Sequence, residues 1–266
     1  MEFRLPRAGL AIAASGALLG GCAGEAAQPP HPPRTGAPSI TAGAPSFTPV
    51  AAQRVVVLDP GHNGGNGANP AAINRQVPDG RGKTKACNTT GTSARDGYPE
   101  HAFNWAVAEQ VRDLLTARGL RVVMTRNDDS GVGPCVDERA AIGNRGDAAA
   151  VVAIHADGAD GAGAHGFHIA YSAPPLNAAQ GEPSVRLANT LRDTMVGAGF
   201  AISSYVGSAG LDPRADLAGL NLSERPTALV ECGNMRDPGD AALLESPDGR
   251  ARIAAAIAAG ITAYLG

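Results

Sequence analysis

The sequence predicts a single α/β domain in which a mainly parallel, twisted sheet carries helices on both faces. Short runs of β-branched residues alternate with longer stretches whose apolar residues recur every three or four positions. These are the patterns of buried strands and of packing helices, respectively. Strands that alternate with helices favour a parallel sheet, because each crossover helix covers one of its faces. The length of residues 54–266 suits one domain with a substantial core.

Each element is indicated by its own residues. RVVVLD at 54–59 is a β-branched run that a Pro-Gly pair ends. Residues 99–118 place Phe103, Val107 and Val111 on one helical face and are followed by a glycine, a common residue just past a helix end. The other expected strands are 121–126, 149–154, 167–171 and 227–232, and the other expected helices are 137–145, 184–196 and 250–265.

Residues 1–22 are typical of an export signal. Two arginines precede an apolar run of alanine, leucine and glycine that is too short to span a bilayer. LGGC at 19–22 resembles a bacterial lipoprotein cleavage box, which predicts that a lipid on Cys22 anchors the protein on the outer face of the cytoplasmic membrane. The alternative is an ordinary signal peptide cut within 23–27, which would discard Cys22 and release the protein.

Residues 23–53 form a predicted tether. They are rich in proline, alanine, glycine, serine and threonine and poor in large apolar side chains, so they cannot bury a core and are expected to be disordered. Such a tether suits an anchored enzyme and an anchored binding protein equally well. The expected organisation is therefore a signal at 1–22, a tether at 23–53 and a catalytic domain at 54–266.

The charge of the chain argues against nucleic acid as a partner. The formal net charge is −3, and the densest basic run, RGKTK at 81–85, is short enough to be a solvated loop. No other apolar stretch approaches membrane-spanning length, so the only expected membrane contact is the N-terminal lipid. We expect a monomer.

The cysteines fit an exported protein. Cys87 and Cys135 both lie in loop sequence rich in glycine, asparagine, aspartate and proline, where an oxidising compartment favours a disulfide between them. Cys232 follows Glu231 in an apolar strand and is expected to be a buried free thiol. A catalytic cysteine is the alternative, but strand alternation should point Cys232 away from Glu231.

Four polar residues lie where an α/β domain carries its site. His62, His155 and Glu231 each fall at or just past the carboxyl end of an expected strand. Glu100 falls in the first turn of the helix at 99–118, where the helix dipole favours a carboxylate. Two imidazoles and a carboxylate can fill three positions of a zinc site, and a further carboxylate can activate water in the fourth.

Each of these residues also has an ordinary explanation. His62 could be a turn residue, Glu100 a helix cap and His155 a satisfied histidine at a strand end. Glu231 could pair with an arginine, although it ends the apolar run TALVE, where an unpaired charge is costly to bury. The coincidence of all four favours a common site.

The segments around these residues resemble a known family. LDPGHNG after the first strand, a glutamate that opens the next helix, IHAD after a later strand and VECGN resemble the zinc-dependent N-acetylmuramoyl-L-alanine amidases of the type-3 amidase family. The fuller ordered pattern GHNG, GRG, GTS, GYPEH, CVDER, HAD, SAPPLN, DLAGLN and ECGNM is similar to the mycobacterial and actinobacterial cell-wall amidases of that family. The resemblance extends from about residue 55 to the C-terminus.

The resemblance implies a role for each of the four residues. His62, Glu100 and His155 match the zinc ligands, and Glu231 matches the catalytic glutamate. The implied substrate is peptidoglycan, and the implied reaction is hydrolysis of the amide bond between N-acetylmuramic acid and L-alanine of the stem peptide. Glu231 would take a proton from the attacking water and pass it to the departing amine.

Two features bear on how far the resemblance extends. Cys232 stands where many members carry a leucine, and it preserves the chemistry if it faces the core. Many Gram-negative relatives carry an autoinhibitory helix in an insertion. The segment 172–199 could conceal one, although SVRLANTLRDTM is typical of an amphipathic packing helix.

Four further residues are weaker candidates for substrate contacts. Arg139 could bind a substrate carboxylate, but a helix ion pair or cap explains it as well. His168 could line the cleft; its HxxH partner His165 would face the other side of a strand, which argues against joint metal ligation. Asn221 and Asn234 flank the last strand and could bond substrate amides, with turn roles as the alternative.

Two rival functions remain at this point. One is a zinc peptidase or carboxypeptidase of the cell wall that cuts within the stem peptide. The other is a non-catalytic, tethered wall-binding lipoprotein, which would not require Glu231.

Overall fold

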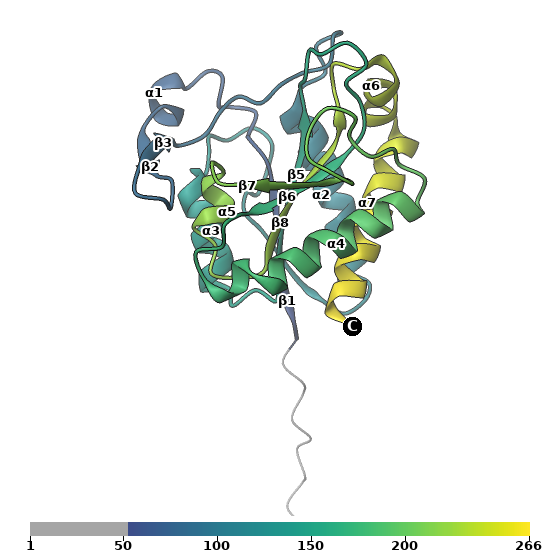
Figure 1. Ribbon diagram of the computed structural model, residues 1–266. Coiled ribbons are helices and arrows are strands. Elements are labelled where there is room, and N and C mark those ends of the chain that lie inside the picture. The colour runs from purple at the N-terminus through teal and green to yellow at the C-terminus, as the bar shows by residue number, and fades with distance from the viewer. Residues whose placement is uncertain (1–52) are drawn as a thin grey trace, which may run out of the picture. The chain divides into compact units, whose positions relative to one another are not determined.

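A six-stranded sheet forms the centre of the domain (Figure 1). The computed structural model describes residues 53–266, so Cys22 and nearly all of the predicted tether lie outside the described residues.

The strand order is β4-β1-β5-β8-β6-β7. Strands β4, β1, β5 and β8 are parallel, whereas β6 is antiparallel to β8 and parallel to β7. The predicted mainly parallel sheet is therefore confirmed. The strands are β1 (Val55–Pro60), β4 (Arg121–Met124), β5 (Ala150–Asp157), β6 (His168–Ser172), β7 (Leu211–Arg214) and β8 (Thr227–Asn234).

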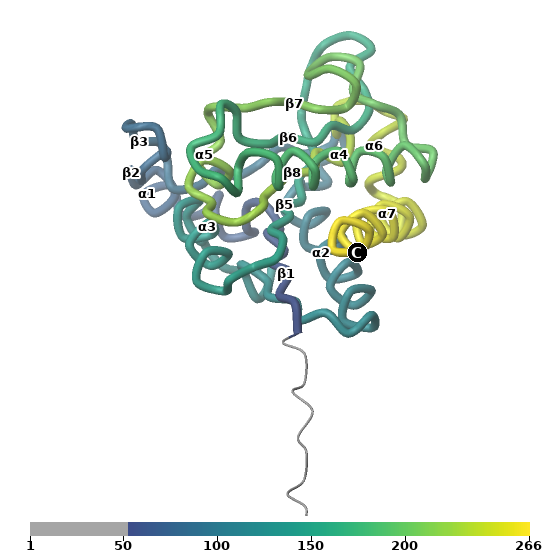
Figure 2. Tube along the Cα trace, turned by 60° about the horizontal axis from the view of Figure 1, so that its bottom comes forward, coloured from purple at the N-terminus to yellow at the C-terminus, as the bar shows by residue number. Residues whose placement is uncertain are grey.

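Helices cover both faces of the sheet, as the sequence predicts (Figure 2). One face carries α2 (Glu100–Thr116), α4 (Glu182–Gly197) and α7 (Pro247–Leu265), and the other carries α3 (Val136–Arg145) and the short α5 (Ala218–Asn221). The first layer is the thicker, because three long helices pack there against the alternate side chains of each strand. The main hydrophobic core lies in that layer.

Strand alternation decides which layer the polar residues of β5 and β8 face. Val230 and Cys232 belong to the main core, whereas Leu229 packs in a small cluster on the α5 side. Because successive side chains of a strand point to opposite faces, Glu231 shares the face of Leu229. The same alternation puts His155 on the face of Ala153, in the same small cluster. Both residues therefore point toward the thinner layer.

Several expected elements differ from those observed. The strand predicted at 149–154 continues to Asp157 as β5, so His155 lies within a strand and not after it. The structure also contains short elements that were not expected from the sequence, because each has too few residues to show a clear period. They are α1 (Pro70–Ile73), β2 (Gln76–Pro78), β3 (Thr84–Ala86), η1 (Ala178–Gln180), α5, β7 and α6 (Pro238–Glu245).

The segment 172–199, considered as a possible autoinhibitory insertion, contains an ordinary packing helix. Within it, α4 buries Leu187, Leu191 and Met195 completely in the main core. In residues 53–266 we find no helix with the length and apolar character needed to cross a bilayer.

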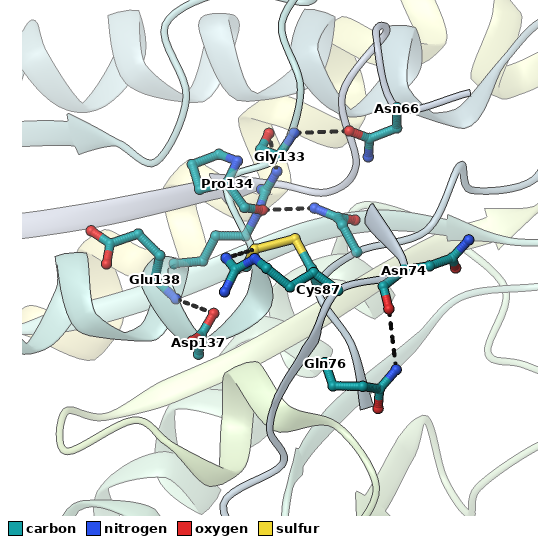
Figure 3. Close-up of a disulfide and its surroundings, with 12 residues drawn as sticks. Asn66, Asn74, Gln76, Cys87, Gly133, Pro134, Asp137 and Glu138 are labelled. Atoms are coloured by element: carbon teal, nitrogen blue, oxygen red, sulfur yellow. Dashed lines mark hydrogen bonds between the residues drawn. A yellow bond between two sulfur atoms is a disulfide. The ribbon is translucent and has the colours of Figure 1, made fainter. Parts of the chain in front are cut away.

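The predicted disulfide is present. Cys87 and Cys135 are bonded, with their Cα atoms 4.4 Å apart, and Cys135 is the residue that precedes α3. Next to the bridge, the backbone N–H of Gly133 donates to Asn66 Oδ1 at 2.8 Å (Figure 3). The bridge therefore fastens the long segment between β1 and α2 to the start of α3. Cys232 is a buried free thiol, as expected.

Replacing both Cys87 and Cys135 by serine is expected to lower the free energy of unfolding by about 4 kcal/mol. The bridge joins residues 48 positions apart and so restricts the unfolded chain. Urea unfolding of the double variant against the oxidised wild type measures the difference, and the reduced wild type should behave like the variant. A loss below about 1 kcal/mol would contradict this assignment of stability to the bridge.

Candidate metal and catalytic site

Three of the four residues singled out in the sequence meet in space. His62 Nε2 lies 3.1 Å from Glu100 Oε2, and His155 Nδ1 lies 2.9 Å from Glu100 Oε1. The two imidazole rings are 5.0 Å apart and nearly perpendicular. One nitrogen from each histidine and one carboxylate oxygen lie within 4.8 Å of one another. The predicted convergence of His62, Glu100 and His155 is thus observed.

His62 reaches this cluster through an uncommon backbone conformation. Its φ is 59°, in the left-handed region, which costs a residue other than glycine about 1 to 3 kcal/mol. On the side of the ring away from Glu100, His62 Nδ1 lies 3.1 Å from the carbonyl oxygen of Thr89. Nε2 is therefore the nitrogen directed at Glu100. The preceding residue must be glycine, because a Cβ on Gly61 would lie 2.1 Å from the His155 ring.

Glu100 is a buried carboxylate at the first residue of α2. The backbone N–H of Thr92 donates to Oε2 at 2.9 Å, and the N–H of Ala156 donates to Oε1 at 3.3 Å. Burial alone would raise the pKa of Glu100, but the hydrogen bonds from His155 and His62 outweigh it and bring the pKa well below its usual range. Glu100 is therefore a carboxylate anion at neutral pH, as a cation ligand requires.

Glu231 lies beside this cluster on the neighbouring strand. In the pairing of β5 with β8, Glu231 is directly opposite His155. Its Oε2 atom is buried and has no hydrogen-bond partner. Burial raises the pKa of Glu231 well above its usual range, and the nearby Glu100 and Asp157 raise it further. This is the environment of a carboxyl group that can take up and release a proton.

Cys232 takes no part in this site. Its side chain lies in the main core on the opposite face of the sheet, with 3% of its surface exposed. Burial raises the pKa of the thiol well above its ordinary value, so the reactive thiolate is disfavoured. The alternative of a catalytic cysteine is therefore excluded.

The donor set fits a small divalent metal ion. A tetrahedral zinc ion with bonds of about 2.0 to 2.2 Å separates its ligand atoms by about 3.3 to 3.6 Å. His62 Nε2 lies 3.1 Å from one oxygen of Glu100 and His155 Nδ1 lies 2.9 Å from the other. One donor atom from each of the three residues lies within 4.8 Å of the other two, a range that includes the zinc spacing. The contact of Thr89 with the second nitrogen of His62 is the kind of bond that orients a metal-binding histidine.

A cleft of about 660 Å³ opens over the cluster. All four residues line it, together with Asn63, Thr92, Asp157 and Arg236, among others. These additional residues were not expected from the sequence. The only signal for Arg236 is its place five positions after Glu231, just past the end of β8. Its Nε is buried without a hydrogen-bond partner.

The structure corrects the expectation that Arg139 contacts substrate. Arg139 is 3% exposed, and its guanidinium is paired with Asp59 and bonded to backbone carbonyls. Burial opposes ionisation of Asp59, but Arg139 and a hydrogen bond from Thr125 outweigh it and lower the pKa of Asp59. Arg139 thus has no free donor turned toward the cleft. Its ion pair is with Asp59 of β1 and not with a residue of its own helix, so the alternative of a helix ion pair is not observed either.

The other three substrate candidates are internal as well. Asn221 is 4% exposed and donates to the carbonyls of Asp79 and Ala215, and Asn234 is 1% exposed and donates to those of Ala159 and Ala164. Both side chains therefore stabilise loops through hydrogen bonds to backbone carbonyls, which agrees with the turn roles considered as the alternative from the sequence. His168 is 2% exposed and does not line the cleft. Burial lowers the pKa of His168, so its neutral form is favoured.

Comparison with known proteins places the chain in a family. The family model described as N-acetylmuramoyl-L-alanine amidase matches residues 56–263. The chain is 50% identical over 211 residues to the N-acetylmuramoyl-L-alanine amidase Rv3717 of Mycobacterium tuberculosis, covering 79% of this chain and 86% of that protein.

Solved structures agree with the family match. The chain resembles the amidase Ami1 of Mycobacterium smegmatis with 53% identity and a TM-score of 0.77, covering 80% of this chain and 97% of that one. Ami1 of Mycobacterium abscessus gives 54% identity and the same TM-score, covering 80% of this chain and 99% of that one. The chain therefore belongs to the N-acetylmuramoyl-L-alanine amidase family and is a peptidoglycan hydrolase of the cell wall.

Proposed function

We propose that this amidase uses zinc held by His62, Glu100 and His155, with Glu231 as the catalytic acid and base. The bond cleaved joins the lactyl group of N-acetylmuramic acid to L-alanine of the stem peptide. The observation that carries the proposal is the meeting of two imidazole nitrogens and a buried carboxylate in one cleft, with a second carboxyl group of raised pKa beside them.

The ligand set supports zinc over the harder divalent cations. Imidazole nitrogen suits zinc and the later transition metals, whereas calcium and magnesium prefer oxygen ligands. Three protein ligands leave a coordination position open, which is the arrangement of catalytic zinc sites. When bound, the ion would supply Lewis acidity that polarises the scissile carbonyl and acidifies water.

Glu231 would move the proton in the reaction. Its unpartnered Oε2 can accept a proton from the water that attacks the amide carbonyl. The protonated Glu231 then donates to the nitrogen of L-alanine as the amide C–N bond breaks. Burial and the nearby Glu100 and Asp157 raise the pKa of Glu231, which favours the protonated form that the second step needs, whereas a bound cation would favour the carboxylate that the first step needs.

The shape of the cleft supports a polymeric substrate. It is open to solvent and bordered by polar groups, including Asn63, Thr92 and Asp157. Arg236 also lines the cleft, and although its Nε lies 3.9 Å from Asp160 Oδ1, its other N–H groups are suited to a carboxylate of the stem peptide.

We also propose that a lipid on Cys22 tethers the enzyme at the cell envelope through residues 23–53. A cell-wall amidase acts outside the cytoplasm, which the export signal read from residues 1–22 serves. The tether would let the domain reach peptidoglycan while its N-terminus stays in the membrane.

Removing zinc with a chelator is expected to abolish hydrolysis of purified peptidoglycan, and one equivalent of zinc should restore it. His62→Ala and His155→Ala should each weaken zinc binding and remove activity, because two protein ligands hold the ion less well than three. His165→Ala is the matched control, since His165 is exposed and does not line the cleft. Full activity in the metal-free protein would refute the zinc proposal.

Glu231→Gln is expected to lower kcat by about 10²- to 10⁴-fold while zinc binding is retained, because the amide cannot accept the proton. Glu182→Gln, an exposed position at the start of α4, is the matched control. The products should be identified by mass spectrometry of digested muropeptides. Intact glycan strands and free stem peptides that begin with L-alanine are expected, whereas cleavage only within the stems would favour a peptidase.

Cys22→Ser is expected to move the protein from the membrane fraction to the soluble or secreted fraction of its host. Serine cannot receive the thioether-linked lipid, although the export signal is kept. Immunoblotting of the fractions measures the change, with Cys232→Ser as a control for loss of a thiol elsewhere. Release of the wild type and Cys22→Ser alike would point to a conventional signal peptide, and membrane association of both alike would also contradict a lipid anchor on Cys22.

A further inference from the structure

Three consecutive carbonyl groups lead from strand β1 to His62, and buried side chains hold each of them. Pro60 accepts hydrogen bonds from Arg139 Nη1 at 2.7 Å and from Arg126 Nε at 3.0 Å. Gly61 accepts from Asn104 Nδ2 at 3.2 Å. Arg139 Nη2 donates to the carbonyl of His62 itself at 2.7 Å. Hydrogen bonds from the buried side chains of Arg126, Arg139 and Asn104 therefore fix the path of the backbone from β1 to His62.

Arg139 is itself held from the opposite side. Its Nη1 pairs with Asp59 Oδ1, and its Nε donates to the carbonyl of Pro134 at 2.9 Å. Nη2 also donates to the carbonyl of Gly133 at 3.1 Å. With 3% of the residue exposed, the guanidinium has little room to rotate. Because all three nitrogens of the planar guanidinium donate hydrogen bonds, Arg139 holds the carbonyl groups that it contacts in fixed positions.

The hydrogen bond to His62 acts where the backbone is strained. With φ at 59°, His62 can relax to an ordinary conformation by turning its own peptide groups. Such a turn would swing its carbonyl away from Arg139 and its imidazole away from Glu100. Thr89 holds the ring of His62, but Arg139 holds its backbone. The two contacts together fix the direction of Nε2.

We propose that Arg139 is a positioning residue for the metal site: anchored by Asp59, it holds the carbonyl of His62 so that the strained backbone presents the imidazole to the metal. The inference rests on the proposed function, because it takes His62 as a zinc ligand. Arg139 contacts the backbone carbonyl of His62 and not its imidazole, so it acts on the metal site through the position of His62.

Arg139→Lys tests the geometry of the support separately from its charge. Lysine can still pair with Asp59, but a single ammonium group cannot reproduce the fork that reaches Pro60 and His62 together. The expected result is a zinc dissociation constant raised by about 10- to 100-fold, the range for residues that orient a metal ligand. The measurement is competition with a chelator, using the full-length protein.

A second readout reports the ligand directly. In the cobalt-substituted protein, visible absorption depends on the number and kind of ligands. Arg139→Lys should shift the cobalt spectrum in the same direction as His62→Ala does. Leu187→Ala, in the main core on the other face of the sheet, is the control for general destabilisation. It should lower the unfolding temperature and leave both zinc affinity and the cobalt spectrum unchanged.

Asp59→Asn keeps the inference testable if Arg139→Lys does not fold. The substitution preserves shape and leaves Arg139 its carbonyl contacts but weakens its anchor, so a smaller loss of zinc affinity is expected. Wild-type zinc affinity and cobalt spectrum in Arg139→Lys, or in Asp59→Asn where the former does not fold, would overturn the inference. Undiminished zinc binding by His62→Ala would instead show that the proposed metal site is wrong.

Discussion

A buried carboxylate between two imidazoles is the interaction on which the rest of the site depends. Glu100 is 4% exposed, and a charge buried to that extent needs compensating partners. Backbone N–H groups of Thr92 and Ala156 supply part of the compensation, and His62 and His155 supply the rest. The loop before α2, the segment after β1 and the end of β5 must therefore meet at one point. The same negative charge makes the cluster suitable for a cation.

The two acids of the site have opposite properties because their surroundings differ. Glu100 receives hydrogen bonds on both oxygens, which bring its pKa well below the usual range despite burial. Glu231 is buried with one oxygen unpartnered and faces the charge of Glu100, so its pKa rises. A cation held at the cluster would favour the charged form of Glu231 and place the resulting carboxylate beside the water it is proposed to activate. Glutamate can thus serve as a metal ligand at position 100 and as a proton carrier at position 231, because the surroundings of the two carboxyl groups differ.

The unequal layers of the fold give this chemistry its space. The thick layer of α2, α4 and α7 encloses the main core, and Cys232 faces it. The thinner layer of α3 and α5 leaves the opposite face open near the ends of β5 and β8, where the cleft lies. Helix α3 also carries Arg139, and the disulfide at its start ties it to the segment after β1. Under the proposed role of Arg139, a change in the stability of that layer would also affect the alignment of His62.

The sequence by itself predicted the α/β class, the long elements, four residues that the structure places around one cleft, and the pairing of Cys87 with Cys135. Periodicity and β-branched runs are local signals, and His62, His155 and Glu231 were identifiable because parallel strands bring their carboxyl ends to one edge. Only the tertiary structure decided that the buried side chains of Arg139, Asn221 and Asn234 donate hydrogen bonds to backbone carbonyls of loops. It alone also placed Arg236 in the lining of the cleft. Such roles depend on contacts between segments far apart in the chain, such as Arg139 with Asp59 and His62, and no local pattern encodes the direction in which a buried side chain points.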